Sequence, residues 1–323
     1  MHSTILVNMH EFLAREWGMG RKWILAGVVW AMAMPAMADY ATGLEEFQRG
    51  NYASALYEWR QEAEKGDAKS QFSMGLLYEQ GLGTRKSLED ARKWYRLAAD
   101  NDHVQAQARL GELYLTGELE GGGAKAAEWF EKAAGQGNAL AQFQLGMLYL
   151  EGRGVVADPE KAAGWLEQAA EKGVIQAQNN IGSLYENGQG VEQDAAKAFE
   201  WYGKAARQGD IYAQNNLGAM YAKGKGVERN NAWAVFWFTM AAKGGNEVAV
   251  DNIPEVLDRL AIKQVAGSRV NIRRGAGTDY DVVAVLRRDD NVHVLGETEG
   301  WSQVYFELND FPELGWVSSS LLK

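Results

Sequence analysis

The chain of 323 residues contains no cysteine and only four histidines. Without cysteine it can form no disulfide, has no thiol nucleophile and cannot be lipidated at a lipobox-type cysteine. His2 and His10 precede residue 39, while His103 and His293 lie far apart in the rest of the chain. A zinc site or a cysteine–histidine pair is therefore not expected, and the sequence predicts no cofactor.

Basic residues and long apolar runs are also scarce. Acidic residues outnumber basic ones by 43 to 33, which gives a formal net charge of −10. Because nucleic acids and anionic lipids are bound by basic patches, neither is expected as a partner. The apolar run over 23–34 is shorter than the ~20 residues that a membrane-spanning helix needs.

The first 38 residues have the pattern of an export signal. Arg21 and Lys22 precede the apolar run, and Ala36 and Ala38 follow it. This order predicts a signal peptide over 1–38, with cleavage before Asp39. The alternative is an uncleaved anchor. We expect an exported protein without membrane contact after cleavage, in the periplasm or secreted, since one signal serves both routes.

Motifs of catalysis are missing as well. The sequence has no Gly-x-Ser-x-Gly elbow, and neighbouring carboxylates such as Glu45-Glu46 and Asp289-Asp290 are interpreted as solvated acidic surface. A recurring Gly-x-Gly follows a predicted helix and lacks the third glycine of a dinucleotide loop, so it is interpreted as a turn. The sequence predicts a protein that is not an enzyme.

Tryptophan recurs every 35 or 36 residues. The six positions are Trp59, Trp94, Trp129, Trp165, Trp201 and Trp237. Gly-x-x-Tyr segments keep the same interval and begin at Gly75, Gly111, Gly146, Gly182 and Gly218. A fixed period of this length indicates stacked repeats, none of which buries its apolar face alone. The repeated aromatic residues are therefore interpreted mainly as core.

Each repeat is predicted to contain two helices. The first, for example Ile175–Asn187, has apolar residues at helical spacing and precedes the Gly-x-Gly turn. The second is predicted to begin after an N-cap and to end at a glycine in left-handed conformation. The predicted N-caps are Ser87, Gly122, Asp158, Asp194 and Asn230, and the terminal glycines are Gly137, Gly173, Gly209 and Gly245. Glu118–Gly123 replaces one turn and predicts a kink or mobile loop.

These segments resemble the Sel-1-like repeat, a relative of the tetratricopeptide repeat. The shared elements are the Leu-Gly-x-Leu-Tyr helix, the Gly-x-Gly-Val turn and the Ala-x-x-Trp-x-x-x-Ala-Ala helix, over about residues 67–245. Residues 40–66 resemble an earlier tetratricopeptide-type pair, and 246–261 are predicted as a closing helix interrupted near Pro254. The resemblance implies a mainly α fold, with an α-solenoid over 39–261.

The helical period ends near Val265. Short β-rich runs follow, separated by Gly, Asp and Asn; they are Val270–Arg273, Val282–Leu286, Val292–Leu295, Trp301–Phe306 and Gly315–Ser318. The series Asn-x-Arg-x-Gly-x-Gly-x-x-Tyr, Gly-Trp and Gly-Trp-Val resembles the bacterial SH3-like domain, a small all-β barrel, over 262–323. Ala276 replaces the usual proline, and residues 307–314 lengthen the last hairpin.

Polar residues occur two positions before each repeat glycine, at what would be the inner face of a tetratricopeptide-type superhelix. They are Ser73, Arg109, Gln144, Asn180 and Asn216, with Asn179 and Asn215 preceding the last two. Stacking would place them in a row that can hydrogen-bond an extended peptide. Alternatively, they cap helices or face water. Arg109, Gln144, Asn179, Asn180, Asn215 and Asn216 are the candidate partner-binding residues.

The barrel offers a second candidate site. Tyr280, Trp301 and Tyr305 are the candidate ligand-binding residues of an aromatic groove of the kind that binds extended peptides. Trp316 belongs to the same set of aromatics, but we interpret it as barrel core, and Trp301 has that alternative too.

The predicted export signal, the missing catalytic motifs and the two resemblances together indicate an exported, non-catalytic binding or scaffold protein of the bacterial envelope. Its solenoid would bind a protein or an extended peptide, and its barrel would contact peptidoglycan or a second protein. Two alternatives stay open, namely a regulator or activator of a cell-wall hydrolase (or a wall enzyme itself) and a secreted host-interaction or adhesion factor.

Overall fold

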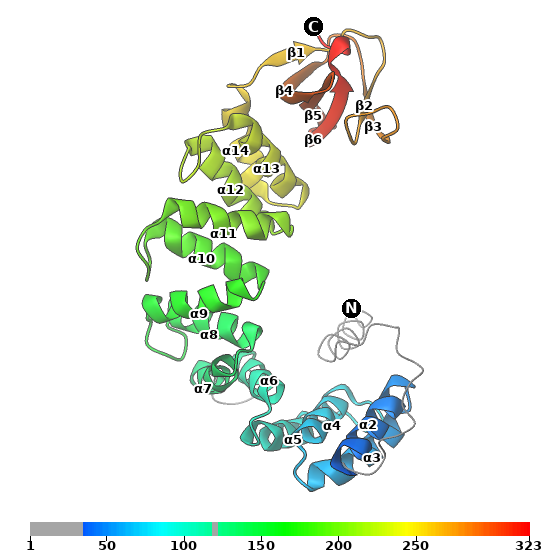
Figure 1. Ribbon diagram of the computed structural model, residues 1–323, viewed down its shortest axis with the longest axis vertical. Coiled ribbons are helices and arrows are strands. Elements are labelled where there is room, and N and C mark those ends of the chain that lie inside the picture. Colours follow the sequence, from blue (N-terminus) through cyan, green and yellow to red (C-terminus); the bar gives the residue numbers. More distant parts are fainter. Residues whose placement is uncertain (1–34, 118–121) are drawn as a thin grey trace. The chain divides into compact units, whose positions relative to one another are not determined.

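The computed structural model describes residues 35–117 and 122–323 (Figure 1). This part of the chain is helical up to residue 257 and mainly β-stranded after it. The described residues divide into two compact units, one that ends at Ala98 and one that begins at Ala99. Most of the predicted signal peptide and the core of the predicted kink, residues 118–121, lie outside the described residues. The helices of the described ranges are all too short or too polar to cross a bilayer.

The first unit is built of paired helices. They are α2 (Pro35–Gln48), α3 (Tyr52–Glu64), α4 (Ala68–Gln80) and α5 (Leu88–Asp100), the last two residues of which belong to the second unit. Trp59 is buried, stacks on Tyr40 at 5.8 Å and donates from Nε1 to the Tyr40 carbonyl at 3.1 Å. Gly50 closes the α2–α3 turn with φ of 83°. The predicted early helix pair is confirmed.

The second unit continues the series with four helix pairs and a closing helix. The pairs are α6 (Val104–Leu115) with α7 (Gly122–Gly135), α8 (Ala139–Glu151) with α9 (Pro159–Glu171), α10 (Ile175–Asn187) with α11 (Ala195–Arg207), and α12 (Ile211–Lys223) with α13 (Asn231–Lys243); α14 (Glu247–Leu257) closes the series. Consecutive helices pack on each other, and first helices of neighbouring repeats also touch, as α6 with α8 and α12 with α14. The predicted solenoid is confirmed.

Local signals in the sequence set the helix ends. The side chains of Asp158, Asp194 and Asn230 each accept a hydrogen bond from a backbone N–H of the first turn, as N-caps do. Gly122 is the exception, because it is the first residue of α7 and not its cap. The glycines predicted to end the second helices have φ between 86° and 96°, the left-handed conformation that glycine adopts without strain.

Two sets of glycines let the helices approach closely. Within α10, a Cβ on Gly182 would lie 2.8 Å from the ring of Tyr202 on α11. In the following turn Gly190 has φ of 72°, and a Cβ there would lie 2.0 Å from the carbonyl oxygen of Pro159, at the start of α9. The first glycine therefore sets packing within a repeat, and the second sets packing between neighbouring repeats.

Pro254 does not interrupt the closing helix as predicted. It lies inside α14, which continues to Leu257. A proline removes one backbone donor and crowds the preceding turn. Here the helix ends three residues later, and burial of Ile253, Val256 and Leu257 in the core formed with α13 holds the last turn in place.

The C-terminal module is a six-stranded antiparallel sheet in the order β1-β4-β5-β6-β2-β3. Its strands are β1 (Ile262–Gln264), β2 (Val270–Arg273), β3 (Val282–Leu286), β4 (Asn291–Thr298), β5 (Trp301–Leu308) and β6 (Phe311–Ser318). The sequence predicts all but β1. Asn309 and Asp310 both have positive φ, which fits the two-residue turn of a type I′ hairpin, so residues 307–314 extend β5 and β6.

One face of this sheet packs on the end of the solenoid. The buried ring of Tyr305 joins a core with Val235 and Phe238 of α13 and with Ile253 and Leu257 of α14. The other face forms the barrel's own core, which includes Val304, Phe306 and Val317. The barrel and the last helices therefore share an apolar interface.

Candidate binding surfaces

The predicted row of amides is present along the first helices of the second unit. Asn216 donates from Nδ2 to Oδ1 of Asn179 at 3.2 Å, and Asn180 donates to Sδ of Met147 at 3.1 Å. Each bond joins neighbouring repeats, and the asparagines are half-buried. An amide has two donor hydrogens and two acceptor lone pairs. The bonds within the row therefore use only part of the capacity of each side chain.

The row continues onto the closing helix. Asn252 of α14 donates from Nδ2 to Oδ1 of Asn215 at 3.0 Å. Asn252 was not among the residues predicted from the sequence. Its position 37 residues after Asn215, close to one repeat, could have identified it. At the other end of the row, Gln144 is half-buried, and Arg109 pairs with Glu112 at 2.6 Å. Ser73, in the first unit, is buried and not available to a ligand.

A second column of amides, which the sequence analysis missed, is structural. It lies four residues before each repeat glycine and consists of Gln71, Gln107, Gln142, Gln178 and Gln214, all at most 5% exposed. Each donates from Nε2, at 3.0–3.1 Å, to a carbonyl eight residues earlier, near the end of the preceding second helix. Each of these carbonyls also accepts a backbone N–H three residues further along, so the glutamine adds a second hydrogen bond at the helix end.

Replacing one of these glutamines should destabilise the solenoid. Gln178→Met keeps the shape but removes two hydrogen bonds. One is the bond to the Ala170 carbonyl, which then accepts only from the Gly173 N–H, and the other is the bond that Gln178 accepts from Gln208 at 2.7 Å. We expect a loss of about 1–3 kcal/mol in the free energy of unfolding, measured with urea. Gln144→Met, at a half-buried position, should change it by less than ~0.5 kcal/mol. Equal effects of the two variants would contradict this role.

The structure separates the candidate groove residues of the barrel. Tyr280 is 51% exposed, while Tyr305 is 4% exposed and covered by α13 and α14. Strand alternation places Trp301 and Tyr305 on one face of β5, and Trp316 pairs with Gln303 on that same face. Trp316 is half-buried and lies outside the barrel core, contrary to the interpretation from sequence. Tyr305 therefore does not line an open groove with Tyr280.

His293 lies beside Tyr305 at the barrel–solenoid interface, with ring centroids 6.1 Å apart. Burial lowers its pKa below the usual value of 6.5, and this effect outweighs the opposing effects of the Leu257 carbonyl, Asp258 and Glu307. The neutral imidazole is thus favoured in the folded protein. Its Nδ1 atom is buried without a hydrogen-bond partner.

Acid should weaken this interface. An unfolded chain takes up a proton on His293 near pH 6.5, whereas the folded chain resists it, so stability falls as the pH drops through that value. We expect thermal unfolding at a lower temperature at pH 5.5 than at pH 7.5, with part of the difference absent in His293→Phe. Circular dichroism measures both. The same pH dependence in the variant and the parent would exclude this contribution.

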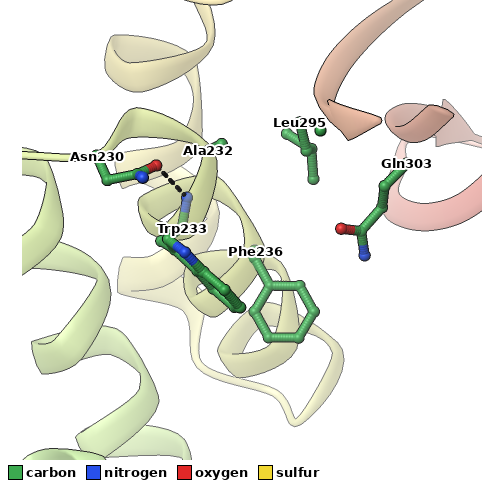
Figure 2. A pocket seen from close by; sticks show the side chains of 7 residues that line it. Asn230, Ala232, Trp233, Phe236, Leu295 and Gln303 are labelled. Atoms are coloured by element: carbon green, nitrogen blue, oxygen red, sulfur yellow. Dashed lines mark hydrogen bonds between the residues drawn. The ribbon is translucent and has the colours of Figure 1, made fainter. Parts of the chain in front are cut away.

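The last two repeats carry an aromatic surface that the sequence analysis did not single out. Its rings follow one another at centroid distances of 5.1–6.1 Å in the order Phe199, Tyr221, Trp233, Phe236 and Trp237. Figure 2 shows Trp233 and Phe236 side by side on α13, opposite Leu295 and Gln303 of the barrel. The exposed fraction of Trp233 is 47%. We call these five residues the aromatic groove.

Within residues 35–117 and 122–323, no group of three or more His, Asp or Glu side chains is arranged to hold a metal ion. His103 caps α6, where its Nδ1 accepts from the Ala106 N–H at 3.3 Å. The arrangements found here are suited to binding through amides and aromatic rings.

Comparison with known families assigns both modules. The Sel1 repeat model matches five consecutive segments that together cover more than half of the chain; they are residues 68–103, 104–138, 139–174, 175–210 and 211–246. The chain belongs to the Sel1 repeat family. The bacterial SH3 domain model matches residues 268–323. Both modules are typical of protein interactions, and Sel1 repeat proteins are generally non-catalytic binding scaffolds.

Solved Sel1 repeat structures resemble this one. A Sel1 repeat protein from Oxalobacter formigenes is 32% identical, with a TM-score of 0.63 over 68% of this chain and 90% of that chain. The protein c5321, a protective antigen present in uropathogenic Escherichia coli strains, is 40% identical with a TM-score of 0.58, over 62% of this chain and 44% of that chain.

Curated relatives share only a few repeats. Chitin synthase regulatory factor 3 of Schizosaccharomyces pombe is 36% identical over 77 residues, which are 24% of this chain and 8% of that protein. DAP3-binding cell death enhancer 1 of Rattus norvegicus is 40% identical over 52 residues, 16% of this chain and 10% of its own length. The chain thus spans about a tenth of these relatives.

Proposed function

We propose that this Sel1 repeat protein is an exported, non-catalytic scaffold of the bacterial envelope. The face of the solenoid that is formed by the first helices of the repeats binds a protein partner or an extended peptide. The SH3 domain contacts peptidoglycan or a second protein. The observation that carries the proposal is the row of half-buried amides, from Gln144 to Asn252, whose hydrogen-bonding capacity is only partly used. Polar groups repeated along a solenoid suit the regularly spaced backbone of an extended segment.

The names of two relatives support a role in binding or regulating other proteins. One is described as a regulatory factor of chitin synthase and the other as DAP3-binding. A regulator of a cell-wall enzyme is accordingly the second candidate. In both cases the two modules act by effective concentration, because one chain holds two ligands together.

Fractionation and sedimentation test this function. The full chain should be recovered from the periplasm with a mature N-terminus at Asp39, and it should sediment with purified peptidoglycan sacculi without releasing soluble fragments. Trp301→Ala, at the half-buried ring of β5, should reduce sedimentation. Recovery from the cytoplasm would refute export, and release of wall fragments would show that the protein is an enzyme.

A further inference from the structure

The aromatic groove arises where the last two repeats depart from the others. Trp233 occupies the position that is Lys125, Lys161 and Lys197 in the preceding repeats, four residues before the repeat tryptophan. Phe236 likewise stands where the preceding repeats have Lys93, Glu128, Gly164 and Glu200. The residues of the preceding repeats at these two positions are charged or small. The repeat pattern therefore does not require an aromatic residue at either position.

The tyrosine of the last repeat, Tyr221, lacks the two partners that the tyrosine of the preceding repeat has. In the preceding repeat, Tyr185 lies under the Lys197 ammonium, 4.9 Å from the ring centroid, and its hydroxyl donates to Glu167 at 2.8 Å. For Tyr221, the equivalent of the lysine is Trp233 and the equivalent of the glutamate is Gly203. Tyr221 stacks on Trp233 with ring centroids 6.1 Å apart.

A cavity opens where these partners are missing. It measures about 420 Å³, lies between α11, α12 and α13, and is lined by Phe199, Tyr221, Trp233 and Trp237 together with Gly203. A second cavity of about 220 Å³ lies beside Phe236 and is also lined by Gly296 of β4 and Gln303 of β5, and Trp233 lines both cavities. The two cavities therefore lie next to each other along α13, and a ligand that occupies both must be extended.

The groove is bordered by positive charge. Lys204 and Arg207 line the larger cavity, and neither forms an ion pair within the part of the chain that the structure describes. The preceding repeat has Gln168 and Glu171 at these positions. Glu200 is the one carboxylate of this lining. The Lys204 ammonium lies over the Trp201 ring, 3.6 Å from its centroid. Two cations without an ion pair in the described residues, in a chain of net charge −10, favour a ligand that carries carboxylates.

We propose that the aromatic groove binds an extended acidic peptide segment of a partner protein. Apolar side chains of the segment stack on Trp233, Tyr221 and Phe236, and its carboxylates pair with Lys204 and Arg207. This inference rests on the proposed binding function but not on the amide row, since it places a separate site on α11, α12 and α13.

Fluorescence anisotropy with the full chain tests the proposal. The probe is a labelled heptapeptide that alternates glutamate and tryptophan, and its counterpart carries lysine for glutamate. We expect the acidic peptide to bind at least ~10-fold more tightly, with an affinity that falls as salt is raised. Equal binding of the two peptides, or tighter binding of an uncharged chitin tetrasaccharide than of the acidic peptide, would overturn the proposal.

Two variants locate the site. Trp233→Lys restores the residue of the preceding repeats, which fold with lysine there, and should weaken binding of the acidic peptide at least ~10-fold. Arg207→Glu should weaken it similarly, whereas Lys132→Glu, beside Trp129 of an earlier repeat, should change it less than ~2-fold. Undiminished binding to Trp233→Lys, combined with loss in Asn179→Leu, would refute the groove and leave the scaffold function standing.

Discussion

Gly190→Ala is expected to lower the free energy of unfolding by about 3 kcal/mol or more. The residue has φ of 72°, and an L side chain in the left-handed region costs roughly 1–2 kcal/mol. Its Cβ would also lie 2.0 Å from the Pro159 carbonyl oxygen, a backbone atom that cannot rotate away. Overpacking of this kind adds about 1–3 kcal/mol. Urea unfolding, followed by circular dichroism, measures the loss.

Two other glycines separate these costs. Gly209 has φ of 92° but no heavy atom within 4 Å of an added Cβ, so Gly209→Ala should cost the strain of about 1–2 kcal/mol alone. Gly164 lies exposed within α9, where Gly164→Ala should stabilise by about 0.5–1 kcal/mol. If Gly190→Ala costs no more than Gly209→Ala, close contact between neighbouring repeats is not what requires the glycine.

Tyr305→Ala is expected to loosen the barrel from the solenoid. The ring is 4% exposed and packs on Val235 and Phe238 of α13, so its removal should cost ~3 kcal/mol. Because the loss falls on one interface, hydrogen exchange should show it locally. Amides of α14 and of the strands β4–β6 should lose about 100-fold in protection, while those of α8 and α9 keep theirs.

The matched variant is Tyr280→Ala. Tyr280 is 51% exposed on the barrel surface and away from the shared core, so its removal should change protection by less than ~3-fold. Similar losses in both variants, or no loss in Tyr305→Ala, would mean that the apolar core between barrel and solenoid does not hold them together.

Local signals made most of the fold predictable. The bounds of Ile175–Asn187 followed from helical spacing and the turn glycine, and those of Val270–Arg273 from β-branched residues between turn residues. Both depend on interactions within a few positions of the chain. The prediction that Pro254 interrupts the closing helix was wrong because it too considered only local interactions. The packing of α14 on α13 outweighs the lost backbone hydrogen bond.

The binding surfaces were predictable only in part. Asn179 and Asn216 lie one repeat apart, so stacking alone brings their amides together. The tertiary structure decides which element covers a given face of a strand. The alternation of residues along β5 therefore did not predict that Tyr305 packs on α13. The aromatic groove was visible as a departure, tryptophan in place of lysine at Trp233, but its cavity depends on three helices.

Photocrosslinking in cells tests most directly whether the amide row binds a partner. The photoreactive p-benzoylphenylalanine replaces Gln144, in the row on α8, or Val156, 88% exposed in the loop before α9. We expect a discrete protein adduct from position 144 that is lost when Asn179→Leu is added, and none from position 156. No adduct from position 144, or the same adducts from both positions, would contradict it.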